Sequence, residues 1–400
     1  MKAPAPVAVT GMGCICAAGK DFPTCVQTLF SKDPDPKPPS RFTARHPETH
    51  PVFEIEASIL THLHSREDLS ITAALGVAAA RQALEDAGWD PEALSRVRSG
   101  VCMGTTVGST MNDEAFYRTY RSGTLPDLFP VRRFLSSNPA EAVARTFDLS
   151  GPCLTLSNAC CSGADAIGTA MSWIRRGICD VAIAGGADEL SRVTYNGFIA
   201  LMITDTRPCR PFDRDRNGLN LGEGAAVMIL EPETSRRVRK RAPRAFVLRY
   251  GSAADGYHLT APDPDGAGLR RAAGRTLSAD GKTLSRIAFV AAHGTGTKDN
   301  DAVEARVLDA LLPGIPFFST KGHTGHTLGA AGAIQAVLAA ACLNRGTIPG
   351  SAGFFTPDPQ LPAHPTRHPQ KIRGDLVLSE SLGFGGANAV LLLKRGGDSS

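Results

Sequence analysis

The sequence lacks several features that would assign a function directly. Its ten cysteines show neither the regular spacing of a disulfide framework nor a CxxC pair of the kind that binds structural zinc. No GxxxxGK(S/T) motif is present, which excludes a phosphate-binding loop. A formal net charge of +4 over 400 residues is too mild to indicate nucleic-acid or membrane binding by itself. We therefore expect a protein whose cysteines are reduced and which has no structural zinc site and no phosphate-binding loop.

Long apolar runs are also scarce. The longest, residues 329–343, is shorter than a membrane span and contains glycines, so we expect a buried helix there and no transmembrane segment. Residues 1–4 lead directly into an expected strand at 7–10, without the apolar stretch of a secretory signal. Together these observations predict a cytoplasmic protein.

One stretch, residues 236–244, is strongly basic. No aromatic residues interleave with its arginines, and basic clusters are common on protein surfaces. We interpret it as a solvated helix end before Pro243, and we expect no nucleic-acid partner.

Short apolar strands alternate with alanine-rich helices along the chain, which predicts an α/β sheet covered by helices. The pattern begins again after the basic stretch, so a boundary near residue 245 would divide the chain into segments 1–245 and 246–400. The expected strands are 100–104, 153–156, 181–184, 225–231, 245–250, 287–291, 316–319 and 376–379, and the expected helices include 69–88, 163–175 and 330–343.

The most informative feature is a cysteine at a strand-to-helix corner. In TLSNACCSGADAIG (155–168) an apolar strand runs through a turn of small residues into a helix rich in alanine and glycine. Cys160 lies on that corner, where free N–H groups and the positive end of the helix dipole favour a thiolate. Most free cysteines only fill space in the core, and we assign to that role Cys14, Cys16, Cys102, Cys179, Cys342 and, with an alternative left open, Cys161.

Three glycine-rich segments each place a polar residue directly after an expected strand, where α/β folds build their sites. They carry His293 in AHGTGT, Lys321 and His326 in STKGHTGHT, and Phe384 in GFGG. His323 and His326 could bind a metal, but they lie on a turn without a third ligand, so we expect none. GFGG could equally be a simple hairpin turn, and a lone histidine after a strand is often structural.

Taken together, these segments resemble the β-ketoacyl synthases, the condensing enzymes of fatty-acid and polyketide synthesis, and most closely the type II enzymes that elongate chains on acyl carrier protein. The similarity covers nearly the whole chain in the family's order, with VTGMG (9–13), AGGAD (184–188), RPFD (210–213) and GEGA (222–225) before the glycine-rich segments. The resemblance implies a thiolase-like five-layer αβαβα fold of the α/β class, with two similar halves that each contain a mixed sheet. It also implies decarboxylative condensation with malonyl carrier protein, without a cofactor or metal.

The resemblance also implies two oxyanion sites. The histidines would hydrogen-bond the enolate oxygen formed when malonyl loses CO2, and backbone N–H groups would hold the second oxyanion. The residues that match these roles are Cys160 as the acylated nucleophile, His293 and His326 as the active-site histidines, Lys321 and Glu304 as supporting charges, Phe384 as the gate whose amide joins that of Cys160 in the oxyanion hole, and Phe198 as a second aromatic at the acyl pocket.

The expected partners are an acyl carrier protein and, in a homodimer or heterodimer, a related ketosynthase-like chain. Relatives often dock the acidic carrier with basic residues before the first long helix, but here that stretch reads Arg66-Glu67-Asp68. Docking through other arginines, such as Arg207 and Arg210, is an alternative, because electrostatic complementarity sets partner choice and encounter rate. An arginine common shortly after the second pocket aromatic is also absent.

Other interpretations stay open at this point. A degradative thiolase would use a second cysteine near the C-terminus, and none follows Cys342. A relative that primes synthesis from acyl-CoA would carry asparagine at one of the histidine positions. A catalytically silent chain-length partner usually lacks the nucleophile, and a Cys–His hydrolase would release free acid. These motifs do not encode the chain length, the carrier or the pathway.

Overall fold

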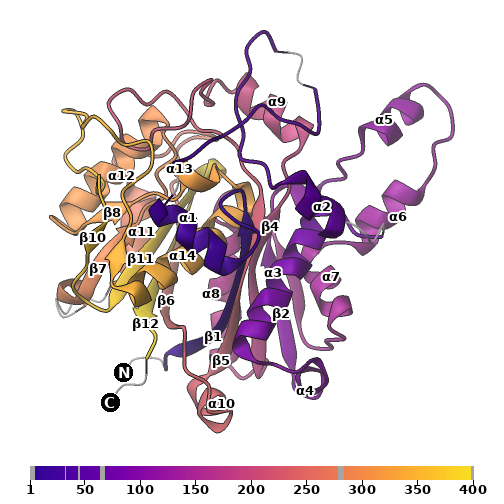
Figure 1. The fold of residues 1–400 in the computed structure, drawn as a ribbon, viewed down its shortest axis with the longest axis horizontal. Helices are drawn as coiled ribbons and strands as arrows, with labels where there is room; N and C mark the ends of the chain where they lie inside the picture. Colours follow the sequence, from indigo (N-terminus) through magenta and orange to yellow (C-terminus); the bar gives the residue numbers. More distant parts are fainter. Residues whose placement is uncertain (1–4, 32, 44–45, 64–67, 278–282, 398–400) are drawn as a thin grey trace.

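A ten-stranded mixed sheet, covered on both faces by helices, forms the frame of the protein (Figure 1). The computed structural model describes residues 5–31, 33–43, 46–63, 68–277 and 283–397. The sheet contains, in spatial order, β3 (Cys153–Leu156), β2 (Ser99–Gly104), β4 (Val181–Asp188), β5 (Gly224–Pro232), β1 (Val7–Cys16), β6 (Ala245–Ala254), β12 (Ala387–Arg395), β11 (Leu376–Gly383), β7 (Ile287–Ala291) and β8 (Phe317–Phe318).

The two halves of this sheet have the same topology. Read outward from the centre, one half runs β1, β5, β4, β2, β3 and the other runs β6, β12, β11, β7, β8. In each half, two antiparallel pairings are followed by two parallel ones. The halves join where β1 pairs with β6 over three residues, so the two expected mixed sheets form one continuous sheet.

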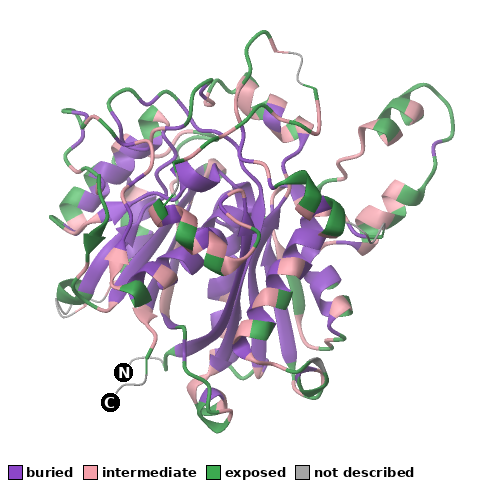
Figure 2. Ribbon diagram, viewed as in Figure 1, coloured by how far each residue is buried: buried purple, intermediate pink, exposed green. Residues whose placement is uncertain are grey.

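Helices form three further layers. Helices α3 (Ile71–Ala87) and α7 (Pro139–Thr146) cover the outer face of the first half, and α11 (Ala267–Thr276) and α12 (Lys298–Leu311) cover that of the second. Helices α8 (Ser162–Arg175) and α14 (Ala331–Arg345) lie between the halves and contact strands of both. The sheet and these central helices are almost wholly buried (Figure 2). The predicted five-layer, thiolase-like architecture is confirmed.

Helix α14 explains the apolar run seen in the sequence. Among the described residues, Leu328–Arg345 is long and apolar enough to cross a membrane, but 89% of it is buried inside the protein, as in a core helix. The helix is apolar on every side because both halves of the sheet contact it. It ends at Gly346, whose φ of 70° is the left-handed conformation that favours glycine at this position.

The basic stretch 236–244 is less solvated than expected. The side chain of Arg236 is buried and forms an ion pair with Glu233. Arg239 stacks over the ring of Trp89 and also forms an ion pair with Glu231. Arg239 thus attaches the end of helix α10 (Glu233–Val238) to β5, whereas the Arg236 ion pair lies within the helix, and both roles are structural.

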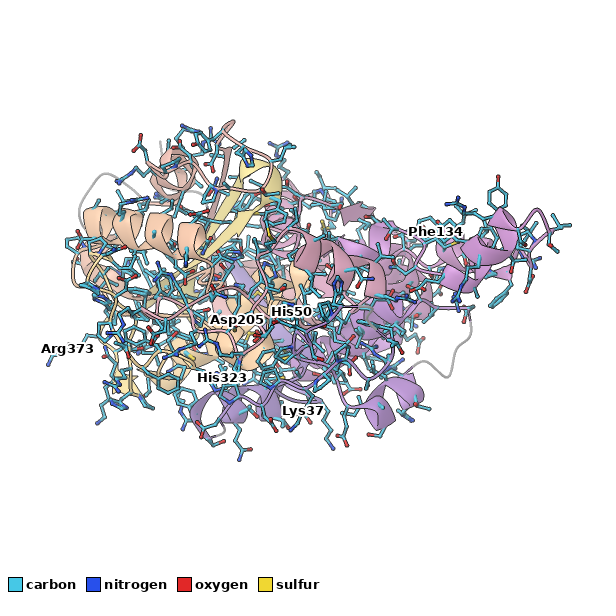
Figure 3. All side chains as sticks on the ribbon, turned by 90° about the horizontal axis from the view of Figure 1, so that it is seen from above. Lys37, His50, Phe134, Asp205, His323 and Arg373 are labelled. Carbon is cyan, nitrogen blue, oxygen red and sulfur yellow. The ribbon has the colours of Figure 1, made fainter. Side chains whose placement is uncertain are left out.

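Smaller elements complete the fold, and two of them form an arm. Helices α5 (Glu114–Arg121) and α6 (Phe129–Ser136) project from the body, and the segment that carries Phe134 extends well beyond the other labelled residues (Figure 3). Neither helix contributes a buried residue. The remaining elements are α1 (Phe22–Ser31), α2 (Ala57–Leu63), α4 (Pro91–Ser95), α9 (Arg192–Ala200), α13 (Lys321–Thr324), β9 (Thr347–Ile348), β10 (Gln370–Lys371) and four short 3-10 turns.

The two central helices cross at a distance that only glycine allows. A Cβ atom on Gly163 of α8 would lie 2.9 Å from the backbone nitrogen of Ala333 on α14. A Cβ atom on Gly332 of α14 would lie equally close to the backbone nitrogen of Ala164 on α8. Because backbone atoms cannot move aside as a side chain can, this crossing sets the spacing of the loops that precede both helices.

The substitution Gly163→Ala should therefore separate α8 from α14. We expect the free energy of unfolding to fall by about 1–3 kcal/mol, the usual effect of overpacking a dense core. Urea denaturation measures this change. Gly274→Ala on α11, where no atom lies within 4 Å of the new Cβ, serves as the control and should leave stability unchanged or raise it. Equal stabilities of the two variants would contradict this account of the crossing.

Candidate active site

A cavity of about 350 Å³ contains five of the residues selected from the sequence. Cys160 precedes α8, His293 follows β7 and His326 lies shortly before α14. Residues of the β11–β12 turn, of α9 and of the segments at 217–219 and 295–300 also line the cavity. The predicted residues on this wall are Cys160, Phe198, His293, His326 and Phe384.

A strained turn presents Cys160 to this cavity. The preceding residue, Ala159, has a φ of 46°, an unfavourable conformation for a residue with a side chain. The Ser162 hydroxyl fixes the turn, because it accepts a hydrogen bond from the Asn158 amide (2.8 Å) and donates one to the Ala159 carbonyl (2.6 Å). Helix α8 begins only at Ser162, so Cys160 lies two residues before it.

The expectation that Cys160 rests as a thiolate is wrong. Burial raises the pKa of the Cys160 thiol to about 11, and this effect exceeds those of the Lys321 charge and of the backbone N–H groups of Phe384 and Cys160, which act in the opposite direction. The side chain is only 7% exposed, and desolvation favours the neutral form of a thiol. Cys160 therefore rests as a thiol, and a role as nucleophile requires that it lose its proton during the reaction.

The two histidines lie beside this sulfur. One nitrogen of each imidazole and the Cys160 Sγ atom all lie within 4.8 Å of one another. The rings of His293 and His326 are 5.3 Å apart and nearly perpendicular. The two imidazoles and the sulfur, distant in sequence, therefore face one volume of the cavity.

Hydrogen bonds set the tautomer of both imidazoles. The Nδ1 atom of His293 lies 3.2 Å from the Lys321 ammonium, and the Nδ1 atom of His326 accepts from the Leu328 amide at 3.0 Å. A neutral imidazole that accepts at Nδ1 carries its proton at Nε2. Burial and the Lys321 charge lower the pKa of His326 to about 3 and that of His293 well below its usual value, so both rings are neutral donors near pH 7.

The predicted supporting charges, Lys321 and Glu304, are buried behind His293. The Lys321 ammonium also donates to the His293 carbonyl. The Glu304 carboxylate accepts from the backbone N–H groups of His293 and Gly294. Burial lowers the pKa of Lys321 to about 8 and raises that of Glu304 to about 7. The two groups hold the His293 backbone from opposite sides.

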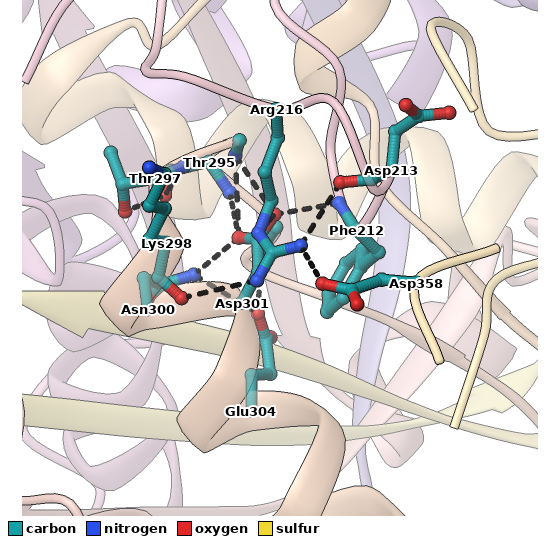
Figure 4. Close-up of polar contacts among 12 residues, drawn as sticks. Phe212, Asp213, Arg216, Thr295, Thr297, Lys298, Asn300, Asp301, Glu304 and Asp358 are labelled. Atoms are coloured by element: carbon teal, nitrogen blue, oxygen red, sulfur yellow. Dashed lines mark hydrogen bonds and ion pairs between the residues drawn. The ribbon is translucent and has the colours of Figure 1, made fainter. Parts of the chain in front are cut away.

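Asp301, one turn before Glu304 on α12, holds the rest of this loop, which the sequence analysis did not foresee. Its carboxylate accepts from the backbone N–H groups of Phe212 (2.6 Å), Thr295 (3.0 Å) and Gly296 (Figure 4). It thereby joins the loop after β7 to the RPFD segment. The sequence signal for this role was the spacing of Asp301 and Glu304, two acidic residues one turn apart on helix α12.

Asp188 is a second positioning residue that the sequence analysis missed. Its buried carboxylate accepts from the Thr105 hydroxyl (2.6 Å), the amides of Thr106 and Val107, and the amide of Gly329 (2.6 Å). It therefore connects the loop that leads from β2 into the arm with the loop after His326. The available signal was an acid at the end of the AGGAD strand.

The GFGG segment is both a hairpin turn and part of the site. It joins β11 to β12, and Gly385 and Gly386 both have a φ of 75°. The backbone N–H groups of Phe384 and Cys160 point toward the Cys160 sulfur. The ring of Phe384 stacks on that of Phe198 with centroids 5.6 Å apart. Two backbone donors and two aromatic rings thus surround the sulfur on this side.

Several other selected residues lie elsewhere. Cys161 is fully buried and donates to the Ser381 carbonyl, as a packing cysteine would. His323 borders a separate groove beside Lys37, and both residues are labelled in Figure 3. Arg210 is held by Asp213 at 3.0 Å and by the ring of Phe355. Arg66 and Glu67 lie outside the described residues.

Two clusters among the described residues have the spacing of a metal site. One is Cys160 with His293 and His326, where the adjacent Lys321 ammonium opposes a cation. The other contains the thiols of Cys14, Cys16 and Cys25, which are fully buried in the core.

Comparison with known families identifies the chain. Residues 5–235 match the N-terminal domain, and residues 244–355 the C-terminal domain, of beta-ketoacyl synthases. The chain belongs to the β-ketoacyl synthase family. It is therefore an acyltransferase that forms carbon–carbon bonds in fatty-acid or polyketide synthesis.

Three similar proteins are named as synthases or ketosynthases, one of them in polyketide synthesis. The chain is 30% identical to a 3-oxoacyl-[acyl-carrier-protein] synthase 2 of Coxiella burnetii over 97% of this chain and 98% of that protein. It is 33% identical to the tetracenomycin polyketide synthase ketoacyl synthase alpha subunit of Streptomyces glaucescens, over 80% of each. Its fold matches a structure of the ishigamide ketosynthase/chain length factor with a TM-score of 0.92 and 28% identity, over 99% of this chain and 100% of that one.

The pKa of Lys321 predicts a basic limit to activity. Malonyl decarboxylation should vary little between about pH 7 and 8, because both imidazoles stay neutral, and should fall above about pH 8 as Lys321 loses its charge. CO2 release measured across this range tests the limit. Lys321→Met should lower the rate about 100-fold and remove the basic limb. The exposed Lys37→Met variant is the control, and a wild-type rate that stays constant to pH 9.5 would disprove the assignment.

Proposed function

We propose that Cys160 carries the growing acyl chain and that His293 and His326 stabilise the enolate formed from a malonyl carrier thioester. One observation carries this proposal: a sulfur and two imidazole donors face the same volume within 4.8 Å. The Phe384 and Cys160 amides supply a second group of donors on the sulfur side.

In the first step, the Cys160 sulfur attacks the carbonyl carbon of an acyl carrier thioester. The new carbon–sulfur bond forms as the bond to the carrier sulfur breaks, and the thiol proton leaves with the carrier thiol. The backbone N–H groups of Cys160 and Phe384 hold the intermediate oxyanion. Because the thiol has a raised pKa, these donors act mainly once negative charge develops.

In the second step, the malonyl group loses CO2. The electron pair of the broken carbon–carbon bond moves toward the thioester oxygen, which becomes an enolate. The two Nε2–H groups of His293 and His326 donate to this oxygen, so no strong base is required. Neutral imidazoles suit this role because they already carry the Nε2–H donors in the resting site and need no change of protonation before CO2 is lost.

In the third step, the enolate carbon attacks the acyl carbon on Cys160. The tetrahedral oxyanion again lies against the Cys160 and Phe384 amides, and its collapse expels the cysteine sulfur as a thiolate, which takes a proton from water to restore the resting thiol. The product is a β-ketoacyl carrier thioester, one two-carbon unit longer. Thr295 and Thr297, which line the outer cavity, contact the carrier's prosthetic arm in this proposal.

Intact-mass measurement after exposure to a panel of acyl carrier thioesters tests the nucleophile. The protein should gain the mass of one acyl group, and Cys160→Ala should gain none, because the sulfur that forms the thioester is absent. Cys153→Ala, which removes an exposed thiol, is the matched control and should still be loaded. Loading of the Cys160→Ala variant would overturn the proposal, and release of free acid without condensation would indicate a hydrolase.

A chain-length-factor-like partner, catalytically silent, is the second candidate. It is raised by the likeness to a structure of the ishigamide ketosynthase/chain length factor, whose name covers both kinds of chain. The complete set of Cys160, His293 and His326 supports the active enzyme instead. A chain that gains no acyl mass alone, but that another ketosynthase requires for activity, would establish this alternative.

We propose an acyl carrier protein, loaded with acyl or malonyl groups, as the substrate-bearing partner. Arg207 is the more available of the two expected docking arginines, because its side chain is 58% exposed whereas Arg210 is held in place. Met202, at the cavity wall, is 88% exposed. A basic and apolar surface beside the cavity suits an acidic carrier.

We also propose a dimer, with a second copy or with a related ketosynthase-like chain. Strand β3 lies at the edge of the sheet, and Leu154 on it is 39% exposed. The arm exposes Tyr120, Leu125 and Leu135. An open strand edge beside apolar side chains is a surface that another chain can cover. We further propose that the chain folds as two halves, residues 1–245 and 246–400, and that the protein is located in the cytoplasm.

The substitution Leu154→Lys should weaken this association, because a charge on the strand edge opposes pairing with another strand. The molar mass from light scattering during gel filtration should fall from that of a dimer toward that of a monomer. Val238→Lys is the control, since Val238 is 83% exposed on the distant helix α10. A dimer that is unaffected by Leu154→Lys would place the interface elsewhere.

A further inference from the structure

A second buried carboxyl group lies against Glu304. Glu380 is on β11 and is only 1% exposed. Its carboxyl group lies within hydrogen-bonding distance of the Glu304 carboxyl. Its Oε2 atom has no hydrogen-bond partner among the residues that the structure describes. No step of the reaction proposed above uses this group.

The surroundings favour one negative charge on the pair. Lys321 on α13 is the ammonium that faces Glu304, and Asp301 on α12 is a further carboxylate that interacts with both. Arg216 lies near Asp301, and its nearest atom is 3.9 Å from that carboxylate. On the α14 side, Gln335 is neutral and donates to the Glu380 carbonyl. Two ionised carboxylates in contact here would repel one another in a medium that screens charge poorly.

Glu304 already has its acceptor role. It receives the His293 and Gly294 amides and, from Asn300, a side-chain N–H. It therefore has to be the ionised member of the pair. Burial and repulsion by Glu304 also raise the pKa of Glu380 well above its usual value, which agrees with a protonated Glu380.

We propose that Glu380 is a positioning residue that keeps a proton against Glu304. Its carboxylic acid donates a hydrogen bond to the Glu304 carboxylate, and Glu304 in turn holds the backbone of His293. The pair so joined carries one negative charge opposite the Lys321 ammonium. This inference rests on the proposed function and adds a residue and a protonation state to it.

Two variants separate a proton donor from a space-filling residue. Glu380→Gln keeps the size and an N–H donor, so malonyl decarboxylation at pH 7 should stay within about threefold of the wild-type rate. Glu380→Leu removes the donor, so Glu304 should take up a proton more readily. Its rate should fall about tenfold or more at pH 6 and recover by pH 8. A structural defect alone would lower the rate equally at all pH values.

Infrared spectroscopy tests the proton without relying on catalysis. The wild-type protein should show a carbonyl band of a protonated carboxylic acid that shifts in D2O and disappears in Glu380→Gln. Glu231→Gln is the matched control. Glu231 is also a fully buried glutamate, but it accepts from Thr10 and Trp89 on another part of the sheet. The control should keep both the band and the pH profile.

The outcomes are decisive in either direction. Persistence of the band in Glu380→Gln, or an equal loss of activity in the Gln and Leu variants at every pH, would overturn the inference. If Glu380→Leu does not fold, the rate of the Glu380→Gln variant and its infrared band still test whether Glu380 is protonated. A band that behaves as expected in a protein that gains no acyl mass would refute the proposed function and leave the shared proton established.

Discussion

The close crossing of α8 and α14 is the constraint on which the rest of the structure depends. Each helix begins just after a loop that carries a residue of the candidate site, Cys160 in one case and His326 in the other. Glycines on both helices bring the two backbones together between the halves of the sheet. The chemistry therefore arises where two buried helix N-termini meet.

Burial at this place determines the charges as well as the positions. It keeps the imidazoles neutral, raises the pKa of the cysteine and lowers that of Lys321. In each case the pKa moves in the direction that favours the neutral form, because burial penalises charge. Under the proposed function, such a site meets charge only as it develops in the reaction, where preorganised donors lower a barrier.

Much of this architecture could be predicted from the sequence. Strands such as β3 and β7 have the predicted bounds, because short apolar runs between turn residues mark strands. Cys160, His293, His326 and Phe384 were singled out because strand ends in α/β folds gather at one edge, whereas Phe198, on helix α9, came from the family resemblance alone. The pairing of β1 with β6, which joins the halves, leaves no local pattern and was not foreseen.

Three aspects of the site could not be predicted in this way. The protonation of Cys160 depends on how deeply the rest of the fold buries it, and the sequence around a helix start suggested the opposite. Asp188 and Glu380 act on segments distant in the chain, so their partners follow from tertiary structure alone. An acidic residue within an apolar strand, such as Glu380, can be recognised as unusual in the sequence. Only the fold shows which residue it contacts.

The bonds of Asp188 have one more consequence. The same carboxylate fastens the base of the exposed arm and the loop behind His326, so a displacement of the arm is coupled to that loop through a single side chain. If the arm contacts another chain and His326 acts as proposed, the contact and the placement of the imidazole share this one anchor.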